Sequence, residues 1–498
     1  MNHASSSRRT FVKGMLAAAS TAVLGFDPVR RTWVTSALAG TPVLSIPGLQ
    51  GALLMDPATL ATFADDFGHI VHHTPIAVLK PAVVQDVVLA VAFCNRHGIQ
   101  VAMRGQGHST AGQSQVQGGL VIDSSTLDAI EEIGDGYVRV QVGLRWKDLL
   151  ATIVPLGLHP PVLTGFVGLS IGGTLSMGGI GPASFKNGAI VDNVLELEVV
   201  TGDGELRCCS PTENPELFYA VLGGVGQYAL IVRAKIPTVP VLPNARNYII
   251  PYVDPNAFFA ATNTLTSAGN VDGVYALLLP PWSPQNPTGS LWVYALNVVK
   301  FFDPSNPPDD ANLILTPLGV PPQAVQVTDS STLAYDTAVD SLIDLLNAAG
   351  FINVAHVWGD VFLPASQTPA FVQSTLPTVI PADLGPGGFV LLFPLRNRSL
   401  NAPAFRLPNA SSLFLFDVLT ADLPGDPNPA GYASTEIAAA RARFEAARAV
   451  GGTLYPIGST PMSQADWAQQ YGVLYPVLKA LKGVFDPNHI LTPGPGIF

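Results

Sequence analysis

Hydrophobic and polar positions in the first half of the chain follow two different periods. Residues 80–98 carry valines spaced for one helix face, after a proline and before a glycine, which is typical of an amphipathic helix. Residues 99–104, 119–127 and 137–144 are short apolar or alternating runs, which predict strands. Residues 146–157 have the helical period again and end at a glycine. This alternation of short strands and helices favours an α+β fold over a helix bundle or a sandwich.

The second half of the chain has a different pattern of apolar, aromatic and proline residues. Residues 194–206 still alternate and reach Gly-Asp-Gly, which indicates a hairpin. After about residue 245, proline-rich loops separate aromatic, strand-like segments, and two long helical patterns cover Leu333–Ala349 and Thr435–Val450. This part predicts a separate, largely antiparallel domain. The final stretch, 485–498, is dense in turn residues and ends in an apolar tripeptide that we expect to dock.

The N-terminus has the zones of an export signal. Paired arginines in the segment 7–13 precede an uncharged run at 14–26, and small residues at 37–39 offer a cleavage site. The run is too short to span a bilayer comfortably. We predict a twin-arginine export signal over residues 1–39 and a periplasmic or extracellular location. An ordinary secretory signal or a membrane anchor is the alternative.

Composition narrows the classes of function. The 498 residues are 48% hydrophobic and 12% charged, enough for two large lobes with extensive cores. The net charge of −11, without a long basic stretch, argues against nucleic acid and against a membrane as partners of the mature protein. Three cysteines, Cys94, Cys208 and Cys209, give neither a zinc-ligand spacing nor a disulfide framework. They are buried thiols or a rare bridge between neighbours, and no metal site is predicted.

Two glycine-rich segments suggest anion-binding loops. Residues 104–113 read RGQGHSTAGQ, and residues 168–181 open a second cluster. Backbone N–H groups in such loops bind pyrophosphate without lysines. Neither segment has a Walker lysine, and the first leads into a strand, unlike a dinucleotide-binding fingerprint. His108 between the glycines is either aimed at a bulky ligand or a surface histidine.

Several motifs together resemble one flavoprotein superfamily. The segments RGQGHS, GGTLSMGGIG, GVGQYALIVRAKI and ILTPGPGIF, in this order, are similar to those of the vanillyl-alcohol oxidase superfamily, and most similar to cytokinin dehydrogenases. The resemblance covers nearly all of the chain after the signal. It implies a two-lobed PCMH-type FAD-binding domain at 40–245 and an antiparallel-sheet substrate (cap) domain at 246–455. A C-terminal segment, 456–498, would return to the FAD domain.

The resemblance also implies how FAD is held. His108 would be bonded covalently to the flavin, and Phe166 stands where some relatives have a second, cysteinyl link, so a single bond is expected. A neutral imidazole held against the ring is a competent nucleophile. The other expected cofactor-binding residues are Gly105, Gln106, Gly107, Ser109, Gln113, Ser170, Ser176, Ile180, Ile231, Tyr455 and Thr492. Pro495 replaces a family glutamine, so one polar contact is expected to be missing.

Substrate oxidation by hydride transfer to flavin N5 needs a proton acceptor. Cytokinin dehydrogenases have an aspartate where this chain has Gly165, so the expected base is absent. Trp358 matches the family's tryptophan near the substrate, and Asp360 two residues later stands where relatives have an asparagine. We hypothesise that Asp360 is the base; the alternative is a solvated loop acid. Tyr455 and His356 are further candidates.

These features predict an exported FAD-dependent oxidoreductase that oxidises a small apolar alcohol or amine, with oxygen or another electron acceptor. The aromatic residues of the second half are expected to line an apolar pocket or to be ordinary core; they are Trp282, Trp292, Tyr294, Trp358 and Phe393. One alternative is a cytokinin dehydrogenase proper, and another is a flavin-carrying binding protein without catalysis. The pattern leaves the oligomeric state open.

Overall fold

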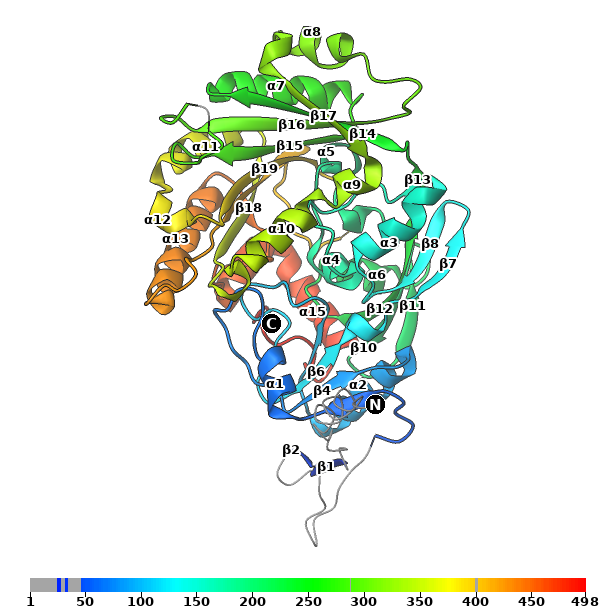
Figure 1. The fold of residues 1–498 in the computed structure, drawn as a ribbon. Coiled ribbons are helices and arrows are strands. Elements are labelled where there is room, and N and C mark those ends of the chain that lie inside the picture. The colour runs from blue at the N-terminus through cyan, green and yellow to red at the C-terminus, as the bar shows by residue number, and fades with distance from the viewer. Residues whose placement is uncertain (1–24, 28–31, 35–45, 287, 399–401) are drawn as a thin grey trace, which may run out of the picture.

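The computed structural model describes residues 25–27, 32–34, 46–286, 288–398 and 402–498. It confirms the α+β prediction: in Figure 1 the sheets of the first half lie below the large sheet of the second half. Most of the export signal predicted over residues 1–39, namely 1–24, 28–31 and 35–39, lies outside the described residues. Within the described residues, no helix is long and apolar enough to cross a membrane.

A mainly parallel sheet of four strands, in the order β3-β4-β6-β5, forms the lower part of the first half. Its strands are β3 (Ala52–Leu54), β4 (Ala77–Lys80), β5 (Val101–Arg104) and β6 (Leu120–Asp123). Helix α2 (Val84–His97) connects β4 and β5 and ends at Gly98, whose φ of 60° suits glycine. Strand β5 is an edge strand of this sheet. The glycine-rich turn that contains His108, residues 104–113, begins at its C-terminal end and is called the histidine turn below.

An antiparallel sheet of five strands, in the order β11-β10-β12-β8-β7, completes the first half. Its strands are β7 (Ile130–Gly134), β8 (Tyr137–Gln141), β10 (Glu196–Thr201), β11 (Leu206–Cys209) and β12 (Ala229–Pro237). The expected hairpin is the pair β10–β11. Helices α3 (Trp146–Ile153), α4 (Ile171–Met177) and α6 (Pro215–Val221) connect these strands. All three cysteines are free thiols.

The second half is built on one antiparallel sheet of eight strands, as its strand-like segments between proline-rich loops predicted. The strand order is β17-β14-β16-β15-β19-β20-β18-β21. The strands are β14 (Asn244–Tyr252), β15 (Gly273–Leu279), β16 (Val293–Phe302), β17 (Gln326–Ser331), β18 (Trp358–Pro364), β19 (Phe389–Arg396), β20 (Ser412–Leu419) and β21 (Thr453–Leu454). These strands lie within 244–454, and the domain boundaries drawn from the sequence stay a prediction.

Helices cover the outer face of the large sheet. Helix α7 (Pro255–Ala268) packs on β14–β16, and α13 (Pro429–Ala449) packs on β18 (Figure 1). Helix α13 begins six residues earlier than the pattern predicted, because the Asn428 side chain accepts a hydrogen bond from Gly431 N at 3.1 Å and caps the helix. The pattern at Leu333–Ala349 is two helices, α9 (Thr332–Asp336) and α10 (Ala338–Ala348), separated at Thr337.

Two short pieces of the predicted export segment pack against the fold. Strands β1 (Gly25–Asp27) and β2 (Thr32–Val34) form an antiparallel pair. The rings of Phe26 and Trp33 are buried against Phe93 of α2, at centroid distances of 5.8 and 5.2 Å. Apolar residues of the segment therefore contribute to the core around α2, although the sequence pattern gave them no place in the fold.

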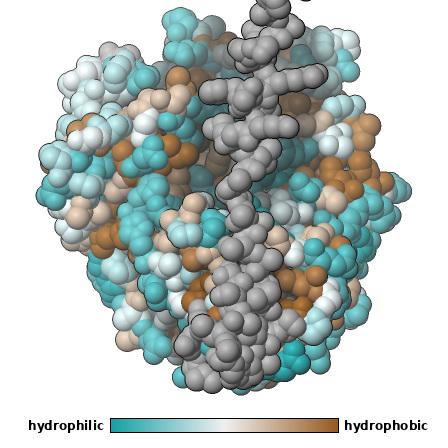
Figure 2. Space-filling model, turned by 60° about the horizontal axis from the view of Figure 1, so that its bottom comes forward, coloured by the Kyte–Doolittle hydropathy of each residue, from teal (hydrophilic) through white to brown (hydrophobic). Residues whose placement is uncertain are grey.

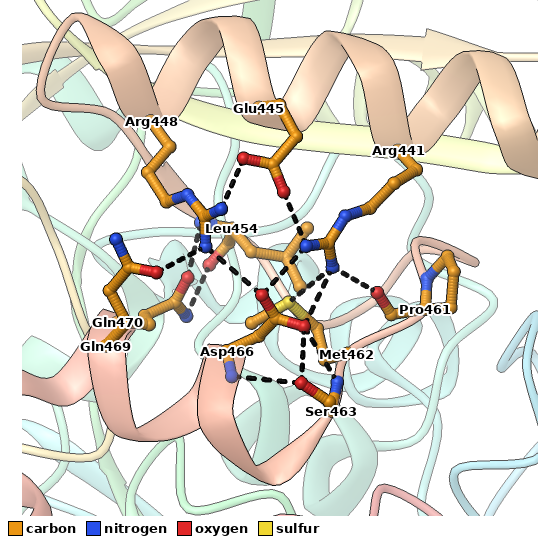
Figure 3. A network of polar contacts seen from close by, with 10 residues as sticks. All are labelled: Arg441, Glu445, Arg448, Leu454, Pro461, Met462, Ser463, Asp466, Gln469 and Gln470. Carbon is orange, nitrogen blue, oxygen red and sulfur yellow. Dashed lines mark hydrogen bonds and ion pairs between the residues drawn. The ribbon is translucent and has the colours of Figure 1, made fainter.

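A cluster of charges joins helix α13 to helix α14 (Gln464–Tyr471) (Figure 3). Asp466 accepts hydrogen bonds from Arg441 Nη2 at 2.8 Å and Arg448 Nη1 at 3.2 Å, and Glu445 lies between the two arginines and pairs with both. Ser463 caps α14 and donates to Asp466 at 2.7 Å. Hydrogen bonding to Arg441 holds the pKa of Asp466 well below its usual range.

We expect Asp466→Asn to destabilise the protein by about 1.5–3 kcal/mol, the usual contribution of a hydrogen-bonded charged group. Because the folded-state pKa is lowered, this contribution is present above the ordinary pKa of 3.8 and is lost as the pH falls below it. Urea unfolding at pH 7 and pH 3.5 measures the effect. Asp344→Asn, in an exposed position of α10, is the control and should stay within about 0.5 kcal/mol of the wild type.

The surface has no unusual concentration of hydrophobic residues on the face drawn in Figure 2. Hydrophobic residues there lie in separate groups between hydrophilic ones. This is the ordinary pattern of a protein surface in water.

Candidate functional site

A large cavity of about 1790 Å³ lies between the first-half sheets and the inner face of the eight-stranded sheet. The structure brings all the expected cofactor-binding residues to its wall; they are Gly105, Gln106, Gly107, His108, Ser109, Gln113, Ser170, Ser176, Ile180, Ile231, Tyr455 and Thr492. They come from the turn after β5, from α4 and its flanking residues, from β12 and from two C-terminal loops, so residues far apart in the sequence meet here.

The buried side chain of Asp66 holds the histidine turn in place through hydrogen bonds. Gly107 and Gly112 have φ values of 67° and 74°, which favour glycine. Asp66 accepts hydrogen bonds from Gly112 N at 2.7 Å and from Ser109 Oγ at 3.0 Å. Burial raises the pKa of Asp66 to about 6, although these bonds oppose the shift. Asp66 thus holds the part of the turn that follows His108, from Ser109 to Gly112.

His108 is half-buried and is surrounded by aromatic rings. Its ring stacks on Phe67 with a centroid distance of 4.2 Å, and Phe166 and Trp358 lie at 5.1 and 5.3 Å. Removal from solvent lowers the pKa of His108 to about 4, so the imidazole is neutral at physiological pH. Its Nε2 atom is buried and has no hydrogen-bond partner among the described residues. A neutral imidazole with a free nitrogen in a cavity wall is chemically suited to bond an electrophilic carbon.

The second glycine-rich segment lies beside the first. Ser170 caps α4, and a Cβ on Gly105 would come within 2.0 Å of Ser170 Oγ, so the two loops approach closely only because position 105 has no side chain. Val225 and Thr492 also line the cavity and have positive φ values of 53° and 47°. Such strained backbone in β-branched residues is concentrated at ligand sites.

The C-terminal loops close the site. Gln113 donates to the Gly458 carbonyl at 2.9 Å, and Gly179 N donates to the Tyr455 hydroxyl at 3.0 Å. Burial raises the pKa of Tyr455 above its ordinary value, so this hydroxyl stays protonated at neutral pH. Burial lowers the pKa of His356 to about 4, and its Nδ1 lies 3.0 Å from the Phe67 carbonyl. Of the two further base candidates, only His356 is in the form that accepts a proton.

Apolar residues line the part of the cavity next to the large sheet and α10. Among the five aromatic residues singled out in the sequence, Trp282, Trp358 and Phe393 line the cavity. Trp292 and Tyr294 lie outside the lining, and Tyr294 is core. Leucines and an isoleucine of α10 add to the apolar wall. A cavity with this wall suits a substrate with a substantial apolar part.

Asp360 is fully buried and is not part of the cavity wall, so it is not a solvated loop acid. Directly opposite it on β20 stands Asp417, which does line the cavity. Burial raises the pKa of Asp360 to about 7, and burial and the neighbouring Asp360 raise that of Asp417 well above its ordinary range. The assignment of Asp360 as the base stays a prediction.

Sequence reasoning missed two acids of this site, Asp66 and Asp417. Asp417 is the only charged residue in the strand SLFLFDVL, and a lone acid in an apolar strand is a signal that could have been used. Asp66 lies in an ordinary polar segment, and nothing in its neighbours indicates that it supports the histidine turn. Only the folded structure reveals that role.

The donor set fits FAD. Two glycine-rich loops line one wall, an unpartnered buried imidazole nitrogen lies beside them, and the cavity is larger than the 300–1,000 Å³ typical of small-ligand sites. The loops present backbone N–H groups of the kind that bind pyrophosphate. The apolar part beyond His108 leaves room for a second molecule.

Comparison with known proteins agrees with this geometry. Residues 75–210 match an FAD binding domain, and residues 283–498 match a domain described as "Cytokinin dehydrogenase 1, FAD and cytokinin binding". The chain is 32% identical over 462 residues to an "Uncharacterized oxidoreductase ORF5 in fasciation locus" of Rhodococcoides fascians, covering 90% of this chain and 99% of that protein. The chain belongs to the cytokinin dehydrogenase family of FAD-dependent oxidoreductases.

Plant members of the family have similar identities. Cytokinin dehydrogenase 2 of Arabidopsis thaliana is 30% identical over 493 residues, covering 93% of this chain and 97% of that protein. Cytokinin dehydrogenase 5 of Oryza sativa subsp. japonica is 30% identical over 488 residues, covering 90% and 91%. The protein is therefore an FAD-dependent oxidoreductase with the two-domain PCMH-type fold, as the motifs predicted.

Proposed function

We propose that this protein is exported, carries FAD bonded covalently to His108, and oxidises a small, largely apolar alcohol or amine. The observation that carries the proposal is the neutral imidazole of His108 in the wall of a cavity lined by two glycine loops, with a buried Nε2 that has no partner in the described part of the chain. Support for the apolar substrate comes from the wall formed by Trp358, Phe393 and α10. Bound FAD supplies a two-electron acceptor.

The residues of this chain have separate tasks in the proposed reaction. Gly105, Gly107 and Ser109 bind the pyrophosphate side of FAD, while Asp66 keeps their turn rigid. Trp358 packs against the substrate and, with Phe67, keeps water away from His108. A buried carboxyl accepts the proton of the substrate O–H or N–H group. The covalent bond also prevents loss of the cofactor after export.

Denaturation and acid precipitation test the covalent bond. We expect the pellet to be yellow, and the mass of the proteolytic peptide containing His108 to be increased by that of FAD. A colourless pellet from protein that was yellow before denaturation would contradict the bond but not FAD binding. Anaerobic addition of a panel of alcohols and amines then tests catalysis, because any substrate bleaches the flavin band. A panel that never bleaches it would favour the flavin-carrying protein without catalysis.

A cytokinin is the second candidate substrate. It is favoured by the match of residues 283–498 to a cytokinin-binding domain, and opposed by Gly165 at the position of the family aspartate. A Cβ at Gly165 would meet only the Phe393 ring, at 3.9 Å, so a side chain can be placed there. Bleaching of the wild-type flavin by N6-isopentenyladenine at a useful rate would support this candidate.

We expect Gly165→Asp to raise the rate of flavin reduction by N6-isopentenyladenine about 10²-fold or more, because it restores a carboxylate at the family position. Gly165→Asn has nearly the same shape without the charge and is the control. Equal rates in the two variants would show that the carboxylate at this position gives no advantage. Stopped-flow absorbance of the flavin band measures the rates.

Export is proposed on the arginine pair and apolar run at the N-terminus. Expression with and without a functional twin-arginine system, followed by fractionation, tests it. We expect the protein outside the cytoplasm only when that system works and only when the arginine pair is intact. Export that continues after replacement of both arginines by lysine would point to the ordinary secretory route.

A further inference from the structure

The most unusual buried groups outside the flavin-contacting residues are two aspartates on neighbouring strands. Asp360 of β18 and Asp417 of β20 are directly opposite each other in an antiparallel register. Directly opposed residues point to the same face with their Cβ atoms about 4.5–5.5 Å apart. Both are buried, and both oxygens of Asp360 and one of Asp417 lack a hydrogen-bond partner in the described structure. Two carboxyls this close cannot both ionise easily.

The pair faces the cavity rather than the outer helices. A Cβ on Gly359 would meet Ala440 of α13 at 3.3 Å, so position 359 faces that helix. Because side chains alternate along a strand, Trp358 and Asp360 point to the opposite face, where Trp358 lines the cavity. Asp417 lies between Asp360 and the open cavity. The Trp358 ring is 5.3 Å from the His108 ring, which places the pair near the expected flavin attachment.

Backbone packing holds Asp360 in this position. Tyr455 N donates to the Asp360 carbonyl at 3.0 Å, and Ser459 N donates to the Trp358 carbonyl at 2.8 Å, so the segment 455–459 runs along β18. A Cβ on Gly458 would come within 2.3 Å of Asp360 Oδ2. Glycine at 458 therefore lets the loop cover the carboxyl of Asp360 and leaves Asp417 as the member that a substrate reaches.

We infer that Asp417 and Asp360 form one acid–base unit, in which Asp417 contacts the substrate and Asp360 is the positioning partner that shares its proton. The inference rests on the proposed oxidation of an alcohol or amine. As the substrate C–H bond breaks, its hydrogen leaves with the bonding electrons to bound FAD, and the O–H or N–H proton passes to Asp417. The substrate becomes a C=O or C=N compound, and the pair goes from one proton to two.

The charged and titratable groups around the two aspartates favour a pair that holds one proton before the reaction. Burial raises the pKa of Asp360, and this outweighs the opposing effects of the hydrogen bond that the two carboxyls make when they share one proton and of the charge of Arg443 on α13. Tyr455 lies against both acids and is itself neutral, because burial raises its pKa. Burial raises the pKa of Asp360 to about 7 and that of Asp417 well above its ordinary range. Because ionisation of one carboxyl disfavours ionisation of its neighbour, the pair keeps one proton just above neutrality. Below pH 7 the pair holds two protons and accepts none.

The pH dependence of flavin reduction tests the pair in the purified, flavin-loaded protein. We expect the wild-type reduction rate to fall as the pH drops through about 7, because the acceptor becomes protonated. Asp417→Asn should lower the rate about 10²–10⁴-fold at pH 8 with flavin content unchanged. Asp360→Asn should keep more activity but displace the acidic limb by about one pH unit or more. Asp422→Asn, a nearby buried carboxyl outside the cavity wall, is the control with the wild-type profile.

A wild-type rate in Asp417→Asn, or an unmoved acidic limb in Asp360→Asn, would overturn the inference. Infrared difference spectra between pH 5.5 and 8.5 give a readout without turnover. Burial also raises the pKa values of Asp66 and Glu436, to about 6 and about 7, so these carboxyls contribute to the same spectra. The wild type and Asp422→Asn should lose the same protonated-carboxyl absorbance, and the double variant Asp360→Asn/Asp417→Asn should lose less of it. A double variant that loses as much as the wild type would assign the titration elsewhere. If no substrate reduces the wild-type flavin while the double variant still loses less absorbance than the wild type, the proposed function fails and the carboxyl pair stands.

Discussion

His108→Ala is expected to abolish covalent attachment of the flavin completely. The variant removes the imidazole with a free, buried Nε2 at the cavity wall, while the two glycine loops and Asp66 remain in place. FAD should therefore still bind, but it should stay in the supernatant after acid precipitation. The ratio of flavin absorbance in pellet and supernatant measures the effect, with one flavin per chain in the wild-type pellet and none in the variant.

The matched control is His356→Ala. His356 is buried and is a second neutral imidazole beside Phe67, stacked on its other side at 4.0 Å, but its Nδ1 already contacts a backbone carbonyl. The flavin of this variant should remain in the pellet. A yellow pellet from His108→Ala would mean that another side chain forms the bond, and the peptide mass would identify it.

Lys482→Met should destabilise the protein by about 3–5 kcal/mol, the usual cost of leaving a buried charge without its partner. Lys482 of α15 (Tyr475–Phe485) is buried, donates to the carbonyls of Gln227 and Leu491 at 2.7 and 3.0 Å, and pairs with Asp486 at 2.7 Å. Asp486 is fully buried and accepts from two backbone N–H groups of the next turn. Methionine fills the space but leaves that carboxylate unpaired.

Urea unfolding monitored by tryptophan fluorescence measures this loss. Lys479→Met, on the exposed side of the same helix, is the control and should change stability by no more than about 0.5 kcal/mol. The double variant Lys482→Met/Asp486→Asn should recover part of the loss, because it removes the unpaired charge. A single variant as stable as the control would show that Asp486 is satisfied by its backbone partners alone.

Local pattern predicted the fold where local interactions decide it. The helix ending at Gly98 and the hairpin β10–β11 depend on a helix stop and a turn that lie within a few residues. The break at Thr337 did not show in the pattern, because its side chain bonds the Leu333 carbonyl without any glycine or proline to mark the interruption. The caps and breaks that polar side chains make were the least predictable boundaries.

The flavin side of the site was predictable because its glycines and His108 lie in short, contiguous motifs. The carboxyl pair was not, because the Asp360–Asp417 contact depends on the register between β18 and β20, which no short segment encodes. Asp360 was selected for its spacing from Trp358, but alternation along a strand does not reveal that Gly458 covers its carboxyl. The pairing of strands decides which of the two acids reaches the cavity.

Residues 491–492 complete one part of the wall of the cavity in which we propose that FAD binds. Leu491 bridges to Val101 at the start of β5, Thr492 N donates to the Val101 carbonyl at 2.8 Å, and Thr492 lines the cavity beside Gly226. These contacts join residues that are far apart in the sequence, so this part of the cavity wall forms only when residues 491–492 have folded back against β5. The proposed attachment of flavin to His108 then depends on that docking, and a chain truncated before Leu491 should emerge without bound flavin.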